Sequence, residues 1–317
     1  MEKRKLGNSG IEVAPLALGG NVFGWTIDEP TSFKIVDGFI DAGFNLVDTA
    51  DVYSRWQAGH IGGESEAIIG NWLKKSGKRD KVVLATKVGM DMGGENKGLS
   101  QKHIFKSVED SLKRLQTDYI DLYQSHKDDP DTPQEETLAA YAELVKQGKI
   151  RVIGASNYSA ARLAEALSIS EQKGYPVYQT LQPEYNLYAR EGYEKELEPF
   201  CVQRGIGVIT YFSLASGFLR GKYRAESDFG KSVRGGSMKR FLNERGFKIL
   251  AALDEVSKQQ NATQAQIALT WLMARKGVSA PIVSATNLEQ LNDILKSVDV
   301  KLDSSAIDKL NQASEWK

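Results

Sequence analysis

The chain has 317 residues, of which 41% are hydrophobic and 26% charged, and its formal net charge is zero. This composition is typical of a globular protein and gives no reason to expect nucleic acid or a membrane as a partner. The N-terminus is polar and the apolar runs are short, so we expect a cytoplasmic protein. The single cysteine, Cys201, excludes a disulfide within the chain and a cysteine-based zinc cluster, and its apolar neighbours favour a buried core residue over a nucleophile.

Short apolar segments alternate with amphipathic segments along the chain. Residues 5–16 contain a Gly/Asn turn between two short runs and predict a β-hairpin that covers one end of the fold. The predicted strands are residues 17–19, 45–48, 82–87, 120–125, 151–155, 178–181, 207–210 and 281–283. The predicted helices are residues 31–42, 64–75, 100–115, 132–147, 160–173 and 194–203, two helices between 239 and 275 with a break at 261–263, and residues 288–296 and 304–313. Thr31 and Ser100 are candidate N-caps.

Eight strand–helix units predict a (β/α)8 TIM barrel with an N-terminal β-hairpin and extra C-terminal helices. Each strand is followed by enough residues for the helical crossover that parallel strands need. No change in composition marks a linker, so we expect residues 1–317 to form a single domain. An open, doubly wound dinucleotide-binding sheet is the alternative, but Gly19–Gly24 lacks the Gly-x-Gly-x-x-Gly spacing that such a sheet requires.

Polar residues recur at the C-terminal ends of the predicted strands, where barrel enzymes carry their active sites. These residues are Asp48, Tyr53, Lys87, His126, Ser156, Asn157, Gln182, Tyr211 and Ser284. Each one alone could be a helix or strand cap, a solvated loop residue or a core aromatic, but their recurrence at one face predicts an active site. A lysine that ends a core strand needs a partner, and Asp48 is the candidate.

The four residues Asp48, Tyr53, Lys87 and His126 suit the reduction of a carbonyl group. The alkoxide that forms when hydride adds to a carbonyl must be protonated, and a tyrosine can supply the proton when a cation lies beside it. Lys87 would be that cation and Asp48 would orient it, while a ring nitrogen of His126 would donate a hydrogen bond to the substrate oxygen.

The chain resembles the aldo-keto reductase family from its first hairpin to its last helix. The resemblance rests on six motifs, at residues 48–53, 86–87, 125–126, 154–157, 182–186 and 284–291. It implies an aldehyde or ketone reductase that uses NADPH, with Tyr53 as proton donor and Asp48, Lys87 and His126 completing a tetrad. The sequence Tyr211-Phe212-Ser213-Leu214 looks like a bacterial branch related to the potassium-channel β subunits.

The same resemblance implies a set of cofactor contacts. Ser156, Asn157 and Gln182 would bind the nicotinamide carboxamide, and Tyr211 would stack on the ring. The segment 217–240 carries seven basic and two acidic residues, an excess of 7 − 2 = +5 that suits a pyrophosphate. The further expected contacts are Ser213, Leu214, Gly217, Lys222, Arg234, Ser284, Thr286 and Gln290. Because the family's usual basic residues at the adenosine 2′-phosphate are replaced here, NADPH is expected but NADH is possible.

Phe23, Trp25 and Trp56 are candidate substrate-pocket residues, although aromatics on barrel loops also pack beneath those loops. A Schiff-base aldolase that uses Lys87 is an alternative, which the neighbouring carboxylate disfavours. A short-chain dehydrogenase is less favoured because Tyr-x-x-x-Lys does not occur in the chain. An NADPH-binding regulatory subunit with little turnover is a further alternative. No metal site is expected, and the sequence does not predict the oligomeric state.

Overall fold

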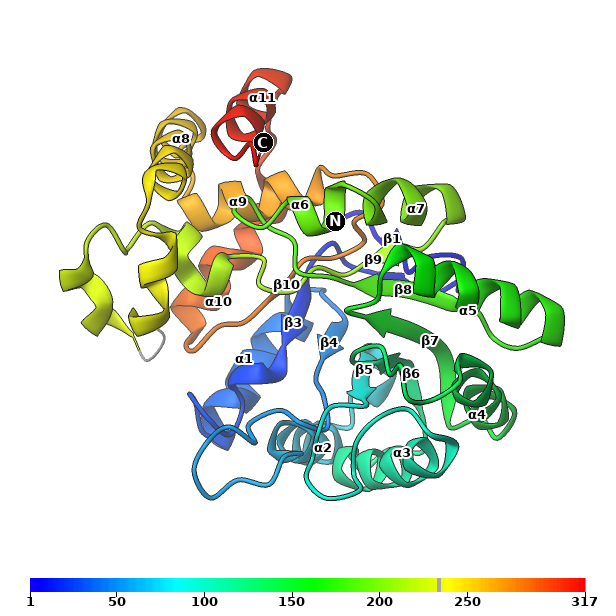
Figure 1. The fold of residues 1–317 in the computed structure, drawn as a ribbon. Coiled ribbons are helices and arrows are strands. Elements are labelled where there is room, and N and C mark those ends of the chain that lie inside the picture. Colours follow the sequence, from blue (N-terminus) through cyan, green and yellow to red (C-terminus); the bar gives the residue numbers. More distant parts are fainter. Residues whose placement is uncertain (233–234, 317) are drawn as a thin grey trace.

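The computed structural model describes residues 1–232 and 235–316, and its centre is a single sheet of eight parallel strands surrounded by helices (Figure 1). In spatial order the strands run β10-β3-β4-β5-β6-β7-β8-β9. Their bounds are β3 (Ala17–Gly19), β4 (Leu46–Asp48), β5 (Val83–Val88), β6 (Ile120–Ser125), β7 (Ile150–Ser156), β8 (Tyr178–Gln182), β9 (Gly207–Val208) and β10 (Ile282–Val283). Each predicted strand is therefore confirmed, with its ends shifted by at most a few residues.

Backbone hydrogen bonds close the sheet into a barrel between β9 and the segment that leads into β10. Val208 donates to the Gly277 carbonyl (2.9 Å), and its own carbonyl accepts from Ser279 (2.8 Å). One step further along, Ile282 donates to the Thr210 carbonyl (2.8 Å). No strand edge is left open at this seam, so the arrangement is the predicted (β/α)8 barrel.

An antiparallel hairpin of β1 (Arg4–Lys5) and β2 (Glu12–Val13) covers the N-terminal end of the barrel, as predicted. The Ser279 hydroxyl donates to the backbone of Lys5 (2.8 Å), which ties the hairpin to the barrel. Gly7 has a φ of +58°, and a Cβ there would lie 2.1 Å from the Gln179 carbonyl oxygen. Only glycine fits this close approach of two backbones.

The barrel interior has an apolar lower layer and a polar upper layer. The lower layer consists of Leu6, Ile11, Val13, Ala17, Leu46, Val83, Ala85, Leu122, Ile209 and Ala280. Side chains alternate along a strand, so the residue two positions after an inward-facing residue also faces inward. Asp48 follows Leu46 on β4, and Lys87 follows Ala85 on β5 in this way. The period that buries the apolar layer therefore also directs these charged groups into the barrel.

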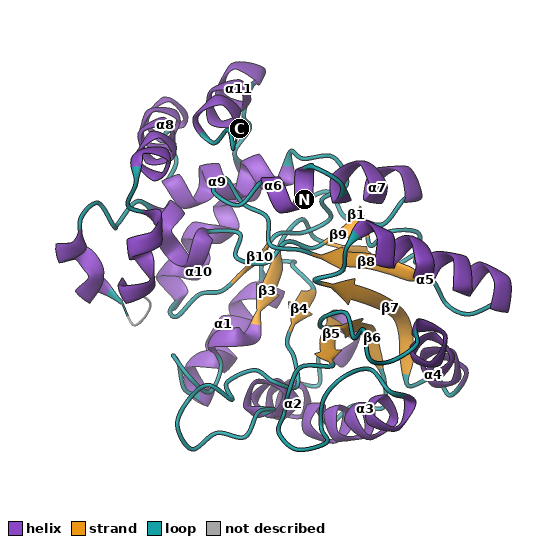
Figure 2. Ribbon diagram, viewed as in Figure 1, coloured by secondary structure: helices purple, strands orange, loops and turns teal. Residues whose placement is uncertain are grey.

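The helices lie around the strands (Figure 2). They are α1 (Glu29–Asp41), α2 (Glu64–Ser76), α3 (Gln101–Leu115), α4 (Gln134–Lys146), α5 (Ala160–Lys173), α6 (Glu191–Glu194), α7 (Leu197–Arg204), α8 (Glu244–Gln260), α9 (Gln264–Met273), α10 (Leu288–Leu295) and α11 (Ser304–Ala313). Within the described residues, no helix is both long and apolar enough to cross a membrane.

Helix boundaries follow their capping residues. Ser100 caps α3 as predicted, because its side chain accepts a hydrogen bond from the backbone of His103. The prediction of Thr31 as the cap of α1 was wrong. The Asp28 side chain accepts from the Thr31 backbone instead, and a proline at the start of α1 supports the earlier boundary. The predicted break between α8 and α9 is confirmed, since Asn261 adopts a left-handed conformation (φ 48°) at the end of α8.

Two helical predictions need correction. The single helix expected at residues 194–203 is two shorter helices, α6 and α7, and α8 begins at Glu244 rather than near residue 239. Before α8, the chain forms short 3-10 helices, η3 (Ala215–Arg220), η4 (Glu226–Lys231) and η5 (Gly235–Phe241). These short helices are the yellow-green to yellow segments that lie below α8 in Figure 1.

Candidate active site

Lys87 lies at the centre of a buried polar cluster, and its side chain has no exposed surface. Its ammonium group donates to the Asp48 carboxylate (2.6 Å), the Thr49 carbonyl (2.8 Å) and the Tyr53 hydroxyl oxygen (2.9 Å). All three ammonium donors are used. The Tyr53 oxygen thus contacts a cation, while the hydroxyl has only a long contact of 3.5 Å with Asp48.

The register of β4 and β5 brings these groups together. Asp48, the last residue of β4, pairs with Ala85 of β5, and Lys87 is two residues further along on the same side of the sheet. The loop after β4 stays close to β5, because the Asp51 backbone donates to the Lys87 carbonyl (3.3 Å). Tyr53 follows two residues later, so the loop returns its side chain to Lys87.

Two glutamine side chains hold the second oxygen of Asp48. Gln182 donates to Oδ2 at 2.9 Å and Gln124 donates to it at 3.2 Å. Both glutamines are buried. Sequence reasoning expected Gln182 to bind a cofactor and did not select Gln124, yet both fix the carboxylate that orients Lys87. The signal for Gln124 was its position two residues after the inward-facing Leu122.

The proton positions in this cluster follow from burial and charge. Burial alone would lower the pKa of Lys87, but Asp48 and Tyr53 oppose this effect and the pKa is raised overall, so the amine stays protonated. Burial raises the pKa of the Tyr53 phenol, and the opposing effect of Lys87 is smaller. The lowering by Lys87 that the sequence suggested is therefore outweighed by desolvation. The phenol keeps its proton at neutral pH, and the free amine that a Schiff-base aldolase needs is disfavoured.

His126 lies beside Tyr53 at the end of β6, with ring centroids 6.0 Å apart. Burial, Lys87 and Lys127 lower the pKa of His126 well below its ordinary value, so the imidazole is neutral. Its buried Nδ1 has no hydrogen-bond partner among the described residues, and the Asn157 side chain donates to its backbone carbonyl (2.9 Å). A neutral imidazole next to the phenol can donate one hydrogen bond to an oxygen that binds between them.

The residues expected to bind the nicotinamide carboxamide lie next to Tyr211, which is expected to stack on the nicotinamide ring. The Ser156 hydroxyl donates to the Gln182 carbonyl (2.8 Å), and the Tyr211 hydroxyl donates to the Asn157 side-chain oxygen (2.9 Å). Asn157 is exposed and left-handed (φ 56°), a conformation that asparagine tolerates better than most residues. Burial raises the pKa of Tyr211 to about 12, which keeps its phenol neutral.

The chain after Tyr211 has an unusual backbone. Positive φ angles occur at Phe212, Ala215, Ser216 and Gly217, and a Cβ on Gly217 would meet open space. Strain of this kind at non-glycine residues persists only where the surroundings impose it, and it occurs often at ligand sites. Of the predicted contacts here, Ser213 is buried and its hydroxyl is bonded within its own turn, whereas Leu214 and Gly217 are partly exposed.

Two acids outside segment 217–240 lower its basic excess from +5 to 5 − 2 = +3, because Asp228 and Glu226 are already counted in the +5. Four of its basic side chains form ion pairs, Arg220 with Asp293, Arg224 with Asp254, Lys231 with Asp228 and Lys239 with Glu226. Lys222 has no carboxylate partner among the described residues, and its ammonium lies over the Tyr223 ring. Arg234 lies outside the described residues. Of the two residues predicted to contact phosphate, the structure describes only Lys222.

The polar side chains of Ser284, Thr286 and Gln290 form hydrogen bonds within the protein. The Ser284 hydroxyl lies 2.8 Å from the Gly19 carbonyl and 2.6 Å from the Asn21 side-chain oxygen. Thr286 donates to the Gln290 side chain through its backbone and its hydroxyl. These residues therefore offer polar atoms but no positive charge.

Aromatic side chains surround the approach to Tyr53. Trp25 and Trp56 meet edge to face with centroids 5.4 Å apart, and Trp56 lies 6.1 Å from the Tyr53 ring and is 51% exposed. Phe23 was predicted to line the substrate pocket, but this prediction was wrong. Phe23 is fully buried and packs beneath its loop. An apolar, partly open surface next to the phenol suits a substrate with an aromatic or aliphatic body.

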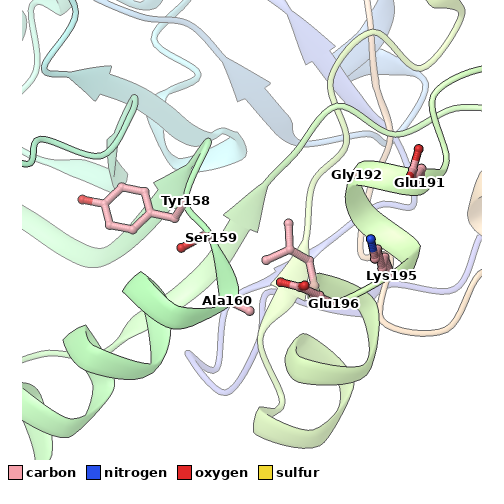
Figure 3. Close-up of a pocket in the computed structure, with 8 residues that line it drawn as sticks. Tyr158, Ser159, Ala160, Glu191, Gly192, Lys195 and Glu196 are labelled. Carbon is pink, nitrogen blue, oxygen red and sulfur yellow. The ribbon is translucent and has the colours of Figure 1, made fainter.

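A separate hollow of about 380 Å³ lies between the start of α5 and the α6–α7 region (Figure 3). Its lining residues are Tyr158, Ser159, Ala160, Glu191, Gly192, Lys195, Glu196 and Leu197. Figure 3 shows Ser159 and Ala160 on one side and Glu191 and Lys195 on the other. No residue of the Asp48–Tyr53–Lys87–His126 cluster lines it, and its charges are mixed, so it is not the reaction site.

Comparison with known proteins assigns the chain to a family. Residues 15–315 match the family profile described as "Aldo/keto reductase family". The chain belongs to the aldo/keto reductase family. Its relatives include "Uncharacterized oxidoreductase YrpG" of Bacillus subtilis, 36% identical over 98% of this chain and 95% of that protein. "Aldo-keto reductase YhdN" of the same organism is 35% identical over 93% of this chain and 88% of that protein.

A second kind of relative lies within the same aldo/keto reductase family. "Probable voltage-gated potassium channel subunit beta" of Arabidopsis thaliana is 33% identical over 100% of this chain and 98% of that protein. The resemblance deduced from the motifs is thereby confirmed, including its link to potassium-channel β subunits. Family membership supports a general oxidoreductase role.

Proposed function

We propose that this aldo/keto reductase reduces an aldehyde or ketone to an alcohol with NADPH, and that Tyr53 donates the proton. The contact between the Lys87 ammonium and the Tyr53 hydroxyl oxygen, 2.9 Å, carries the proposal. A phenol in contact with a cation can release its proton because the ammonium stabilises the phenolate that remains.

The four residues have separate roles in the proposed reaction. His126 and Tyr53 bind the carbonyl oxygen between them. A reduced nicotinamide, when bound, would supply the hydride for the carbonyl carbon. Tyr53 then transfers its proton to the oxygen, and Lys87 stabilises the phenolate. Asp48, fixed by Gln182 and Gln124, keeps Lys87 protonated and in position.

Residues around the cluster suit a reduced nicotinamide. Ser156 and Asn157 present hydroxyl and amide groups at the strand ends, and the neutral Tyr211 ring, joined to Asn157, would hold the cofactor ring against one face. The open space at Gly217 leaves room for a pyrophosphate to approach the backbone. Lys222 would supply a positive charge to the pyrophosphate. This donor set fits the cofactor's chemistry.

The preference for NADPH over NADH rests on few charges in this protein. Ser284, Thr286 and Gln290 can offer hydrogen bonds to a 2′-phosphate, and Arg220 is held by Asp293 (3.7 Å). We therefore expect a modest preference, with NADH accepted at higher concentration. Steady-state rates with the two cofactors at matched substrate concentration measure this ratio.

The decisive assay is steady-state oxidation of NADPH with a panel of aromatic and aliphatic aldehydes. Turnover that depends on aldehyde, and an alcohol product in equal amount to the NADPH consumed, would support the proposal. Tight NADPH binding with no aldehyde-dependent oxidation would contradict it. A Schiff-base aldolase would instead be trapped on Lys87 by borohydride.

The second candidate function is an NADPH-binding regulatory subunit with little turnover. The 33% identity to a protein named as a probable potassium-channel β subunit favours keeping it. Such a subunit would retain the Tyr53–Lys87 contact yet release product very slowly. Pre-steady-state kinetics with excess NADPH and aldehyde distinguish the two functions, because a regulatory subunit would oxidise about one NADPH per protein in a burst and then turn over very slowly, whereas a reductase would continue at its steady-state rate.

A further inference from the structure

Asp51 lies in the loop between Asp48 and Tyr53, and its carboxyl is not among the hydrogen bonds of the Lys87 ammonium or the Tyr53 hydroxyl. It precedes Tyr53 by two residues, and its backbone donates to the Lys87 carbonyl (3.3 Å). The residue is 2% exposed, and Oδ1 of its carboxyl has no hydrogen-bond partner among the described residues. A buried, unpaired carboxylate oxygen is costly, so this group needs a physical explanation.

The neighbours of Asp51 do not supply enough positive charge. Glu66 of α2 is fully buried, and its two oxygens accept from the Thr86 hydroxyl (2.6 Å) and from Arg114 of α3 (2.7 Å). Arg114 is the cation that faces both carboxyls, and its hydrogen bonds go to Glu66 and to Ser111. One guanidinium cannot balance two buried carboxylates.

The remaining groups that face Asp51 do not change this balance. Lys87 of β5 is already paired with Asp48. The buried hydroxyl of Tyr123 on β6 has no hydrogen-bond partner in the described part of the chain, and burial raises the pKa of Tyr123 and of Tyr141 on α4, so both phenols are neutral. The three buried acids Asp48, Glu66 and Asp51 face two cations, the buried Lys87 and the partly exposed Arg114. The arrangement is neutral only if one acid holds a proton.

Asp51 is the acid that takes the proton. Burial, and then the charge of Glu66, raise the pKa of Asp51 to about 8 against the opposing effect of Arg114. Glu66 has hydrogen-bond donors on both oxygens, whereas Oδ1 of Asp51 has none among the described residues. At neutral pH Asp51 is therefore a carboxylic acid, buried in the same loop as Tyr53.

We propose that Asp51 is a positioning residue whose neutral acid form keeps the Tyr53 loop packed on β5, and whose ionisation weakens the contact between Tyr53 and Lys87. Ionisation would place an unpaired charge in the buried region and draw Arg114 and Lys87 towards it. The proposal rests on the reductase function proposed above. It predicts that turnover is lost on the alkaline side while Tyr53 is still protonated.

The pH profile of kcat tests this proposal, with Asp51→Asn as the neutral mimic and Asp80→Asn, an exposed acid at the other end of β5, as the matched control. A group with a pKa of about 8 is roughly nine-tenths protonated at pH 7 and one-tenth at pH 9, so wild-type kcat should fall about tenfold. The kcat of Asp80→Asn should fall by the same factor, and the kcat of Asp51→Asn should not change between pH 7 and pH 9. The KM for aldehyde should be unchanged in all three proteins. An equal fall in Asp51→Asn would overturn the proposal.

A second variant covers the case in which Asp51→Asn does not fold. Glu66→Gln removes the charge that raises the pKa of Asp51, so the midpoint of the alkaline fall in kcat should move to lower pH. An unchanged midpoint would contradict the proposal.

Equilibrium unfolding by urea separates this proposal from the reductase function, because it needs neither cofactor nor substrate. A carboxyl with a raised folded pKa makes the protein lose stability as pH rises from the unfolded carboxyl pKa towards about 8. Wild type should show this loss from pH 5 to 8 and Asp51→Asn should show less of it. If wild type loses stability in this way but reduces no aldehyde, the proposed reductase function is refuted while the protonated Asp51 is supported. If the free energy of unfolding changes with pH by the same amount in wild type and Asp51→Asn, Asp51 is not protonated in the folded protein.

Discussion

Replacing Lys87 by methionine should destabilise the fold as well as stop the reaction. The Asp48 and Lys87 side chains are 2% and 0% exposed and lie 2.6 Å apart. Removing one partner of a buried pair typically costs about 3–5 kcal/mol, because the other charge stays buried. Asp48 keeps the two glutamine donors, Gln182 and Gln124, so we expect the lower end of that range, about 3 kcal/mol.

A double-mutant cycle at Asp48 and Lys87 isolates the interaction. Asp48→Asn combined with Lys87→Met leaves no buried charge at the pair, so the double variant should lose less stability than the sum of the single variants, by about 2 kcal/mol. Urea unfolding at pH 7 without cofactor measures all four proteins. The pKa of Lys87 is raised, so its contribution should be constant below its unfolded pKa and be lost only in strong alkali. Additive losses, or a loss under about 1 kcal/mol in Lys87→Met, would refute the reasoning.

Three further outcomes follow from the site. Lys222→Ala should raise the Kd for NADPH about tenfold and leave kcat unchanged, while the ion-paired Lys231→Ala should change neither, as fluorescence titration would test. Trp56→Ala should raise KM for aromatic aldehydes about tenfold and change KM for a small aliphatic aldehyde little, in steady-state kinetics. The pKa of His126 is well below its ordinary value, so kcat should not fall between pH 8 and pH 6, and a fall with a midpoint near 6.5 would show a protonating imidazole.

The fold and the central site could be predicted because both follow from local patterns. Asp48 and Lys87 stand at the ends of apolar strands, where an unpaired charge would be costly, so the sequence itself indicates that they meet. Helix starts were less secure. Thr31 was chosen as the cap of α1, although Asp28 and the proline after Glu29 carry the stronger signal.

Other features depend on contacts between distant segments and could not be deduced from local patterns. The charges of Arg220 and Arg224 are balanced by Asp293 and Asp254, which come from α10 and α8. Phe23 is fully buried, and its local sequence does not indicate this burial. Asp51 lies inside a recognised motif, but only the structure shows that Glu66 already occupies Arg114.

The most direct test of the account is the single-turnover rate of hydride transfer in Tyr53→Phe, measured with saturating NADPH and an aromatic aldehyde. Phenylalanine keeps the ring and removes the proton, so the rate should fall about a hundredfold or more while the Kd for NADPH stays the same. A wild-type rate in Tyr53→Phe would contradict the role of Tyr53 as proton donor.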